Sequence, residues 1–231
     1  MSSLEYGYLG PPGTFSEQAI SNYCASYGGR TTACDSIRDI VKAVSTDKVD
    51  LGLLPLENSL EGSVNLSLDL LYQHPELKLY REIVLPIAQY LLVQPGVKKE
   101  EISEIYSHPQ AIAQSGDYLA DKFKDVKIIY TDSTAAAAKK TLAARNRAAV
   151  GSIRLSEIYE LEIMAKNLQG DLPNATRFVL AAKRIRILAQ TIIWARQQRV
   201  ILKLQSFVLL KSMKQGYCIK FWGSLLLKIL I

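Results

Sequence analysis

The chain has 231 residues, of which 48% are hydrophobic and 22% are charged, a composition typical of a folded globular protein and not of a disordered one. Two histidines leave little material for a histidine-built metal site or a Ser-His-Asp triad, and three cysteines without metal-like spacing fit a reducing compartment. No uncharged apolar run reaches the ~18 residues that span a bilayer, and no signal peptide precedes the first predicted strand. We therefore expect a cytoplasmic protein.

The net charge of +6 is unevenly distributed. Nine of the 28 Lys and Arg residues follow Lys183, whereas no Asp or Glu follows Asp171. The first 183 residues therefore carry 19 basic against 22 acidic groups, a net charge of −3. Because the basic excess belongs to the segment least like a folded domain, the overall charge does not indicate a nucleic-acid partner.

The N-terminal region predicts a strand, a glycine loop and a helix. Residues 6–9 are strand-like and end in the Gly-Pro-Pro-Gly turn at 10–13. A capping-box sequence at 14–17 then opens a helix to about Tyr27. This order places free backbone N–H groups at a helix N-terminus, which is a natural site for an anion.

A second polar site is predicted where a buried strand over 49–56 ends. Glu57, Asn58 and Ser59 follow that strand directly. Open α/β sheets place ligands just past the carboxyl ends of parallel strands. A solvated loop that caps the next helix explains the same residues equally well.

The rest of the first 183 residues continues the alternation. Residues 83–93 are β-like with a proline inside, and we interpret them as one strand that bends into a second lobe. Further elements are predicted as helices over 35–46, 64–72, 111–123, 135–144 and within 156–164, and as strands ending at 105–110 or spanning 126–130 and 147–151.

The polar pair Thr176-Arg177 comes immediately before the apolar run at 178–182. Arg can hold a carboxylate bidentately, and a neighbouring Thr can share a proton with the same ligand. An ordinary turn that feeds an edge strand is the alternative. Together the pattern predicts an α/β fold with parallel or mixed sheets and a cleft between two lobes for a small acidic ligand. We expect one lobe over about 1–80 plus 173–183, and the other over about 81–172.

At these residues the sequence resembles the prephenate dehydratase family. The resemblance implies a two-lobed catalytic region like the type-II periplasmic binding proteins, and a hydro-lyase that converts prephenate to phenylpyruvate, water and carbon dioxide in phenylalanine biosynthesis. The matching stretches occur in the family's order and are Gly10–Ser16, Pro55–Val64, Ser107–Ala111, Ser133–Ala135 and Asn174–Phe178.

The resemblance also implies which residues form the site. Thr176, Arg177 and Glu57 are the expected catalytic residues, with the Thr176 hydroxyl as a hydrogen-bond donor or relay. The expected substrate-binding residues are Thr14, Phe15, Ser16, Asn58, Ser59, Ser107, Gln114, Ser133, Thr134 and Phe178. Structural roles for Glu57, as a helix cap, and for Gln114, as a loop anchor, remain open. No metal or organic cofactor is implied.

Two other functions remain open. One is arogenate dehydratase, whose substrate carries an amino group where prephenate carries a keto group. The other is a non-enzymatic module that binds or senses small anions on the same fold. The resemblance further implies a homodimer or homotetramer, if the family's assembly survives without its usual C-terminal domain.

The resemblance stops after Lys183, where the family commonly continues into a phenylalanine-binding ACT domain. Residues 184–231 form a basic tail without acidic residues and without recognisable ACT segments. Our leading hypothesis is a reading-frame shift near codon 183. The alternative is a basic amphipathic tail that binds a membrane surface or a partner.

Under the frameshift hypothesis we expect phenylalanine not to inhibit the protein, and we expect its C-terminus to promote aggregation. Translating the other two frames downstream of codon 183 tests the hypothesis, because one of them must encode an ACT-like segment. An activity assay with added phenylalanine tests the consequence, and normal inhibition would contradict it.

Overall fold

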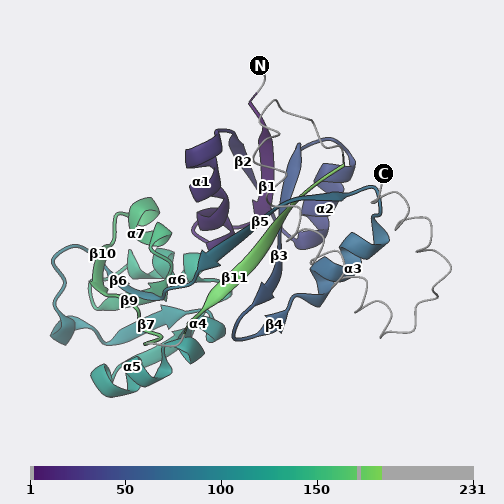
Figure 1. The fold of residues 1–231 in the computed structure, drawn as a ribbon. Helices are drawn as coiled ribbons and strands as arrows, with labels where there is room; N and C mark the ends of the chain where they lie inside the picture. The colour runs from purple at the N-terminus through teal and green to yellow at the C-terminus, as the bar shows by residue number, and fades with distance from the viewer. Residues whose placement is uncertain (1–2, 171–172, 184–231) are drawn as a thin grey trace.

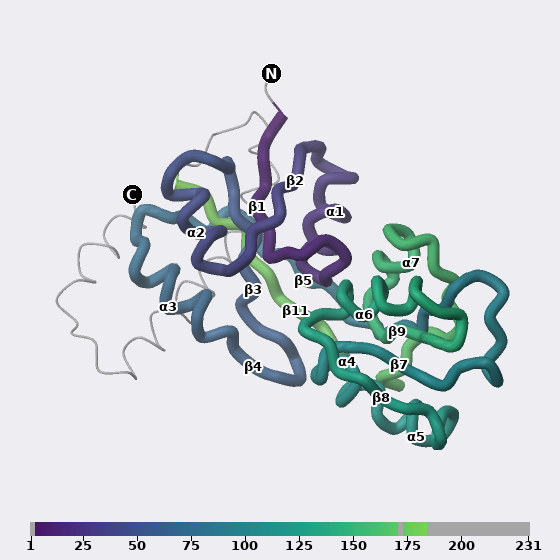
Figure 2. Tube along the Cα trace, turned by 180° about the vertical axis from the view of Figure 1, so that it is seen from behind, coloured from purple at the N-terminus to yellow at the C-terminus, as the bar shows by residue number. Residues whose placement is uncertain are grey.

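The structure, a computed structural model, describes residues 3–170 and 173–183. The two hypotheses on the tail at 184–231 concern residues outside that description. Two β-sheets, each with its own helices, form two lobes, and Figures 1 and 2 show them side by side from opposite directions. The expected two-lobed α/β class with mixed sheets is confirmed.

The first lobe is built on a sheet with strand order β2-β1-β3-β11-β5, to which β4 adds by pairing with β3. Its strands are β1 (Glu5–Leu9), β2 (Arg30–Cys34), β3 (Leu51–Asn58), β4 (Gly62–Ser63), β5 (Lys78–Pro86) and β11 (Ala175–Ala182), and its helices are α1 (Phe15–Tyr27), α2 (Ile37–Ser45) and α3 (Asn65–Gln73).

The second lobe is built on a five-stranded sheet of order β10-β6-β9-β7-β8. Its strands are β6 (Tyr90–Val93), β7 (Glu104–Ser107), β8 (Lys127–Tyr130), β9 (Arg147–Gly151) and β10 (Glu162–Ala165), and its helices are the 3-10 helix η1 (Lys99–Glu101), α4 (Pro109–Gln114), α5 (Gly116–Lys122), α6 (Thr134–Thr141) and α7 (Arg154–Tyr159).

The chain passes between the lobes at residues 87–89. The single bent strand predicted over 83–93 is in fact two strands, with β5 in the first sheet and β6 in the second. The crossing therefore lies later than the expected boundary at residue 80. Between the strands, the N–H of Ile87 donates to the carbonyl of Asn174 at 2.8 Å, so the outgoing crossing is bonded to the returning one.

The returning strand β11 is central and not at an edge. It pairs antiparallel with β3 on one side and antiparallel with β5 on the other, as Figure 1 shows. Thr176 lies opposite Asn58, and Arg177 lies opposite Glu57. Because the pairing is antiparallel, the start of β11 lies beside the carboxyl end of β3. The sheet is therefore mixed, and its two predicted polar segments come together.

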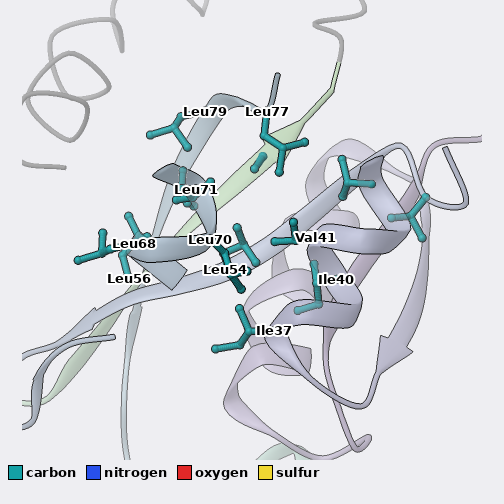
Figure 3. Packing of buried hydrophobic residues seen from close by; sticks show 14 residues of the cluster. Ile37, Ile40, Val41, Leu54, Leu56, Leu68, Leu70, Leu71, Leu77 and Leu79 are labelled. Carbon is teal, nitrogen blue, oxygen red and sulfur yellow. The ribbon is translucent and has the colours of Figure 1, made fainter. Parts of the chain in front are cut away.

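Two hydrophobic clusters cover the two faces of the first sheet. One joins α2 and α3 to β3, where Ile40 of α2 points at the sheet (Figure 3). A Cβ added at Gly52 would lie 2.5 Å from the Cγ2 of Ile40, so the absence of a side chain lets helix and strand approach. The other cluster packs α1 against the opposite face.

The glycine loop after β1 is one place where the first lobe contacts the second. The buried hydroxyl of Ser152 donates to the carbonyl of Gly13 at 2.8 Å. Gly13 has a φ of +93°, and a Cβ added to it would overlap the side chain of Leu155. Both the backbone conformation and the contact across the lobes therefore require glycine here.

We predict that Gly13→Ala lowers the free energy of unfolding by about 1–3 kcal/mol, because the added methyl group overpacks against Leu155. Gly28→Ala is the matched control: Gly28 also has a positive φ, of +73°, but no atom lies within 4 Å of an added Cβ. Urea unfolding of both variants separates the packing cost from the conformational cost. Equal destabilisation would contradict a specific contact between the lobes.

Candidate functional site

The side chain of Asn58, at the end of β3, binds the two segments around it. Its Oδ1 accepts hydrogen bonds from the backbone N–H groups of Leu60 and Glu61, at 3.0 and 3.2 Å. Its Nδ2 donates to the Oγ1 of Thr176 at 2.9 Å and to the Oδ1 of Asn174 at 3.0 Å. Asn58 is 9% exposed, and all its polar groups are used.

These bonds exclude Asn58 as an acceptor for the Thr176 hydroxyl proton. A backbone N–H can only donate, so the atom of Asn58 that it meets must be the oxygen. The other atom of that amide is therefore the NH₂ group, which cannot accept. The Oγ1 of Thr176 must accept from it, and the hydroxyl proton of Thr176 is left to donate elsewhere.

The same network reaches the second lobe through Gln114 at the end of α4. The Oε1 of Gln114 accepts from the Nδ2 of Asn174 at 3.2 Å and from the Nε2 of Gln89 at 2.9 Å. The structure thus brings together three residues expected in the site, Asn58, Gln114 and Thr176, although they come from both lobes. The expected anchoring role of Gln114 and its role as a lining residue are compatible here.

Arg177 lies on the other face of the sheet from Thr176. Phe178 packs in the cluster on the α1 face and Val179 in the cluster on the α2–α3 face, which shows the alternation of β11. By this alternation Arg177 shares the face of Val179. Its guanidinium contacts the carboxylates of Glu82 at 2.9 Å and Glu57 at 3.7 Å.

The expectation that Thr176 and Arg177 hold one ligand side by side is therefore not supported. Adjacent residues of a strand point to opposite faces, so the hydroxyl and the guanidinium diverge. Glu57 lies with Arg177 and not with Thr176. The 44% exposed side chain of Arg177 is held instead by two acidic partners.

The N-terminus of α1 is capped by its own residues. The Thr14 hydroxyl donates to the carbonyl of Leu9 at 3.0 Å and accepts from the N–H of Glu17 at 3.3 Å. The Glu17 carboxylate accepts from the N–H of Gly13 at 2.6 Å, one residue before the position that the capping box predicts. Arg154 of the second lobe lies 3.7 Å from Glu17. The α1 terminus is thus partly occupied by a carboxylate.

The N-terminus of α6 lies close to the glycine loop that precedes α1, across the lobes. Ser133 caps α6 by accepting from the N–H of Ala136 at 3.0 Å. A Cβ added at Gly13 would lie 3.6 Å from the Cβ of Ala135, in the first turn of α6. The first turn of α6, which begins with Thr134, therefore adjoins the glycine loop that precedes Thr14.

Burial and nearby charge also set the chemistry of Tyr8 on β1. Burial, reinforced by the Glu17 carboxylate, raises the pKa of Tyr8 to about 12. The Tyr8 side chain therefore remains a neutral phenol throughout the neutral pH range.

Comparison with known proteins identifies the family. The sequence profile described as prephenate dehydratase matches residues 6–186. The chain belongs to the prephenate dehydratase family.

Relatives in this family carry two substrate names. The chain is 40% identical to a prephenate dehydratase of Lactococcus lactis, over 78% of this chain and 64% of the relative. It is 39% identical to arogenate dehydratase 1 of Petunia hybrida, over 79% of this chain and 43% of the relative. A crystal structure of prephenate dehydratase from Arthrobacter aurescens in complex with L-Phe superposes with a TM-score of 0.71 and 28% identity, over 78% of this chain and 61% of that one. The chain thus spans less than two thirds of each.

Several other residues predicted for the site have hydrogen-bond or packing partners within the protein. Ser107 is fully buried and donates to the carbonyl of Val150 at 2.7 Å, and Phe178 is 2% exposed in the core. Ser59 donates to the carbonyl of Pro173 at 3.3 Å and accepts from the N–H of Ala175 at 2.9 Å, so it fixes the segment before β11. Phe15 packs against the core and Ser16 is 7% exposed. Packing explains Phe178 fully, and we leave it out of the proposed site.

Two residues of the network were missed by the sequence analysis as site residues. Asn174 stood inside a matching stretch, so its place beside Thr176 was a usable signal. Gln89 stood inside a β-like run and gave no signal, because only the break between β5 and β6 turns it toward Gln114.

Two general features of the described residues concern other kinds of site. No group of three or more His, Cys, Asp and Glu in residues 3–170 and 173–183 is placed to hold a metal ion. Within the same ranges no helix has the length and apolar character needed to cross a membrane.

We predict that Asn58→Ala lowers the free energy of unfolding by about 1–3 kcal/mol, because it leaves two backbone N–H groups and the side-chain oxygen Oδ1 of Asn174 without their partner. Asn146→Ala is the control, since Asn146 is exposed and its side chain donates one bond to Ser103. Urea unfolding measures both, and the control is expected to stay within about 0.5 kcal/mol of the parent. A neutral Asn58→Ala would show that the network contributes no stability.

Proposed function

We propose that the chain catalyses the decarboxylating dehydration of prephenate to phenylpyruvate. Membership of the family supports the reaction class, and the observation that carries the assignment of the site is the Asn58–Thr176 hydrogen bond. It leaves one hydroxyl proton directed away from Asn58, at the point where both lobes meet. The proposed setting is phenylalanine biosynthesis in the cytoplasm, by a homodimer or homotetramer.

The reaction needs such a donor. The carbon–carbon bond to the ring carboxylate breaks, carbon dioxide leaves, and the released electron pair makes the ring aromatic while it expels the ring hydroxyl. Hydroxide is a poor leaving group, so a hydrogen bond or a proton must stabilise it as it departs. The Thr176 hydroxyl supplies the hydrogen bond and keeps its own proton, and the departing hydroxide takes a proton from solvent to become water. A Thr hydroxyl is a weak acid, so its role is charge stabilisation in an oriented position.

Prephenate carries two carboxylates, and the proposed partners for them are the helix starts. The first turn of α6, which Ser133 caps and Thr134 begins, is near the glycine loop, and the positive end of the helix dipole there favours an anion. Glu17 already occupies part of the α1 terminus. Thr14 and Ser16 therefore serve mainly to shape this end, and α6 is the stronger anion partner.

In this proposal Arg177 and Glu57 act indirectly, by holding β11 in place. Because Glu82 and Glu57 hold the Arg177 guanidinium on the opposite face, the ion pairs tie β11 to β5 and β3 on either side. They thereby fix the strand that carries Thr176. The Arg177 guanidinium does not need to reach the substrate to matter for the reaction.

Arogenate is the second candidate substrate, favoured by the Petunia relative. It differs from prephenate in its side-chain ammonium group, for which an acceptor is required. Parallel assays with prephenate and arogenate decide the preference. A chain that binds but converts neither substrate would support the non-enzymatic alternative.

We predict that Thr176→Ala lowers kcat by about 10²- to 10³-fold, the loss typical of removing one hydrogen-bond donor that stabilises charge in the transition state. Thr176→Ser is the matched control, because it keeps the hydroxyl that accepts from Asn58. The absorbance of phenylpyruvate formed from prephenate measures both. Equal activity of Thr176→Ala and the parent chain would overturn the role of Thr176, and equal loss in both variants would assign the effect to packing of the methyl group.

A further inference from the structure

Four side-chain amides form one continuous chain between the lobes. It runs from Asn58 to Asn174, then to Gln114, and ends at Gln89, through donor–acceptor distances of 3.0, 3.2 and 2.9 Å. Asn174 is 6% exposed and Gln89 is 2% exposed, so neither is free to contact a substrate.

Chemistry fixes the direction of every bond in this chain. The N–H groups of Leu60 and Glu61 set the oxygen of Asn58, and its NH₂ group then requires an oxygen on Asn174. The NH₂ group of Asn174 in turn requires an oxygen on Gln114. No amide of the chain can flip alone without placing two donors or two acceptors together.

Gln89, the last amide of this chain, shows the effect of the fixed direction. Gln89 donates its NH₂ group to Gln114, and its buried Oε1 has no hydrogen-bond partner among the described residues. Because the oxygen of Gln114 requires a donor, Gln89 must direct its NH₂ group toward Gln114, and its Oε1 is the atom left without a partner in the described part of the protein. Gln114 keeps its own NH₂ group outside the chain.

We propose that Gln89 and Asn174 are positioning residues, which hold Gln114 and the Thr176 hydroxyl in the orientation the reaction uses. Gln89 acts on the oxygen of Gln114, and Asn174 acts on the NH₂ group of Asn58. The N–H groups of Leu60 and Glu61 set the direction of the Asn58 amide, and Asn174 helps to hold its NH₂ group where Thr176 must accept from it. This inference rests on the proposed function of the site.

Acidic replacements distinguish direction from mere contact. In Asn174→Asp, a carboxylate still accepts from Asn58, and Gln114 and Gln89 can both flip to restore complementary bonds. In Gln89→Glu, Gln114 must flip to donate to the carboxylate, and this forces Asn174 to turn its NH₂ group against that of Asn58, which Leu60 and Glu61 hold fixed. We therefore expect Gln89→Glu to lower kcat more than Asn174→Asp does, although Gln89 is farther from Thr176 along the chain of amides.

A double-mutant cycle in the full-length protein tests the coupling between Gln89 and Thr176. Gln89→Met keeps the length of the side chain and removes its bond to Gln114. We expect it to lower kcat about tenfold with little change in KM, within the range of coupling between residues of one network. In the Thr176→Ala background the same change should have almost no effect on kcat. Single-turnover assays keep the weak activity of that background measurable.

Gln94→Met is the matched control for this cycle. Gln94 is a partly buried glutamine of the second lobe whose NH₂ group donates to the carbonyl of Thr141 at 2.9 Å, outside the chain of amides. It should leave kcat unchanged. Equal losses from Gln89→Met in both backgrounds, or the same loss from Gln94→Met, would overturn the proposal.

A second measurement is independent of activity. In side-chain amide ¹H–¹⁵N spectra, Gln89→Met should shift the NH₂ signals of Gln114, Asn174 and Asn58, and Gln94→Met should shift none of them. Unshifted signals of Asn174 and Asn58 would overturn the proposal even in an active protein. If the parent chain does not convert prephenate, the proposed function fails, while these spectra still decide whether the chain of amides exists.

Discussion

The carboxamide of Asn58 is the interaction on which the candidate site depends. It closes the turn after β3 by accepting from two backbone N–H groups, and it donates to Thr176 and Asn174 at the start of β11. Because those segments are more than a hundred residues apart along the chain, one small side chain joins the outgoing and returning parts of the first lobe. A residue with only donors or only acceptors could not satisfy both sides.

The arrangement separates charge from the hydroxyl group. Thr176 faces the amide network, while Arg177, one residue later, faces Glu57 and Glu82 on the other side of the sheet. A guanidinium beside the hydroxyl would compete for the same acceptor on a substrate. The alternation of a strand thus places two adjacent residues of one motif on different faces, with the Thr176 hydroxyl in the amide network and Arg177 in ion pairs that anchor the strand.

Sequence reasoning succeeded where local chemistry determines the structure. The cap at Thr14, the helix predicted over 35–46 and the polar end of β3 follow from residues near in sequence, and the structure has all three. It failed where long-range pairing decides. Strand β2 has mostly exposed residues and no alternation of apolar residues to reveal it. The central position of β11 and the turn of Gln89 toward Gln114 depend on strands from both halves of the chain. The Thr176-Arg177 pair was found by its motif, but its geometry required the register.

The central position of β11 has a consequence for how the protein comes to be folded. During synthesis β3 and β5 emerge more than eighty residues before the strand that must lie between them, so the first sheet stays incomplete while the whole second lobe is made. The second lobe is continuous in sequence from β6 to β10 and can assemble first. Among the described residues β11 is the strand that closes the first sheet, and the same pairing aligns Thr176 with Asn58, so closure of the sheet and assembly of the site depend on one strand. A chain that ends before residue 175 lacks β11, so the facing edges of β3 and β5 stay unpaired and open to pairing with another chain.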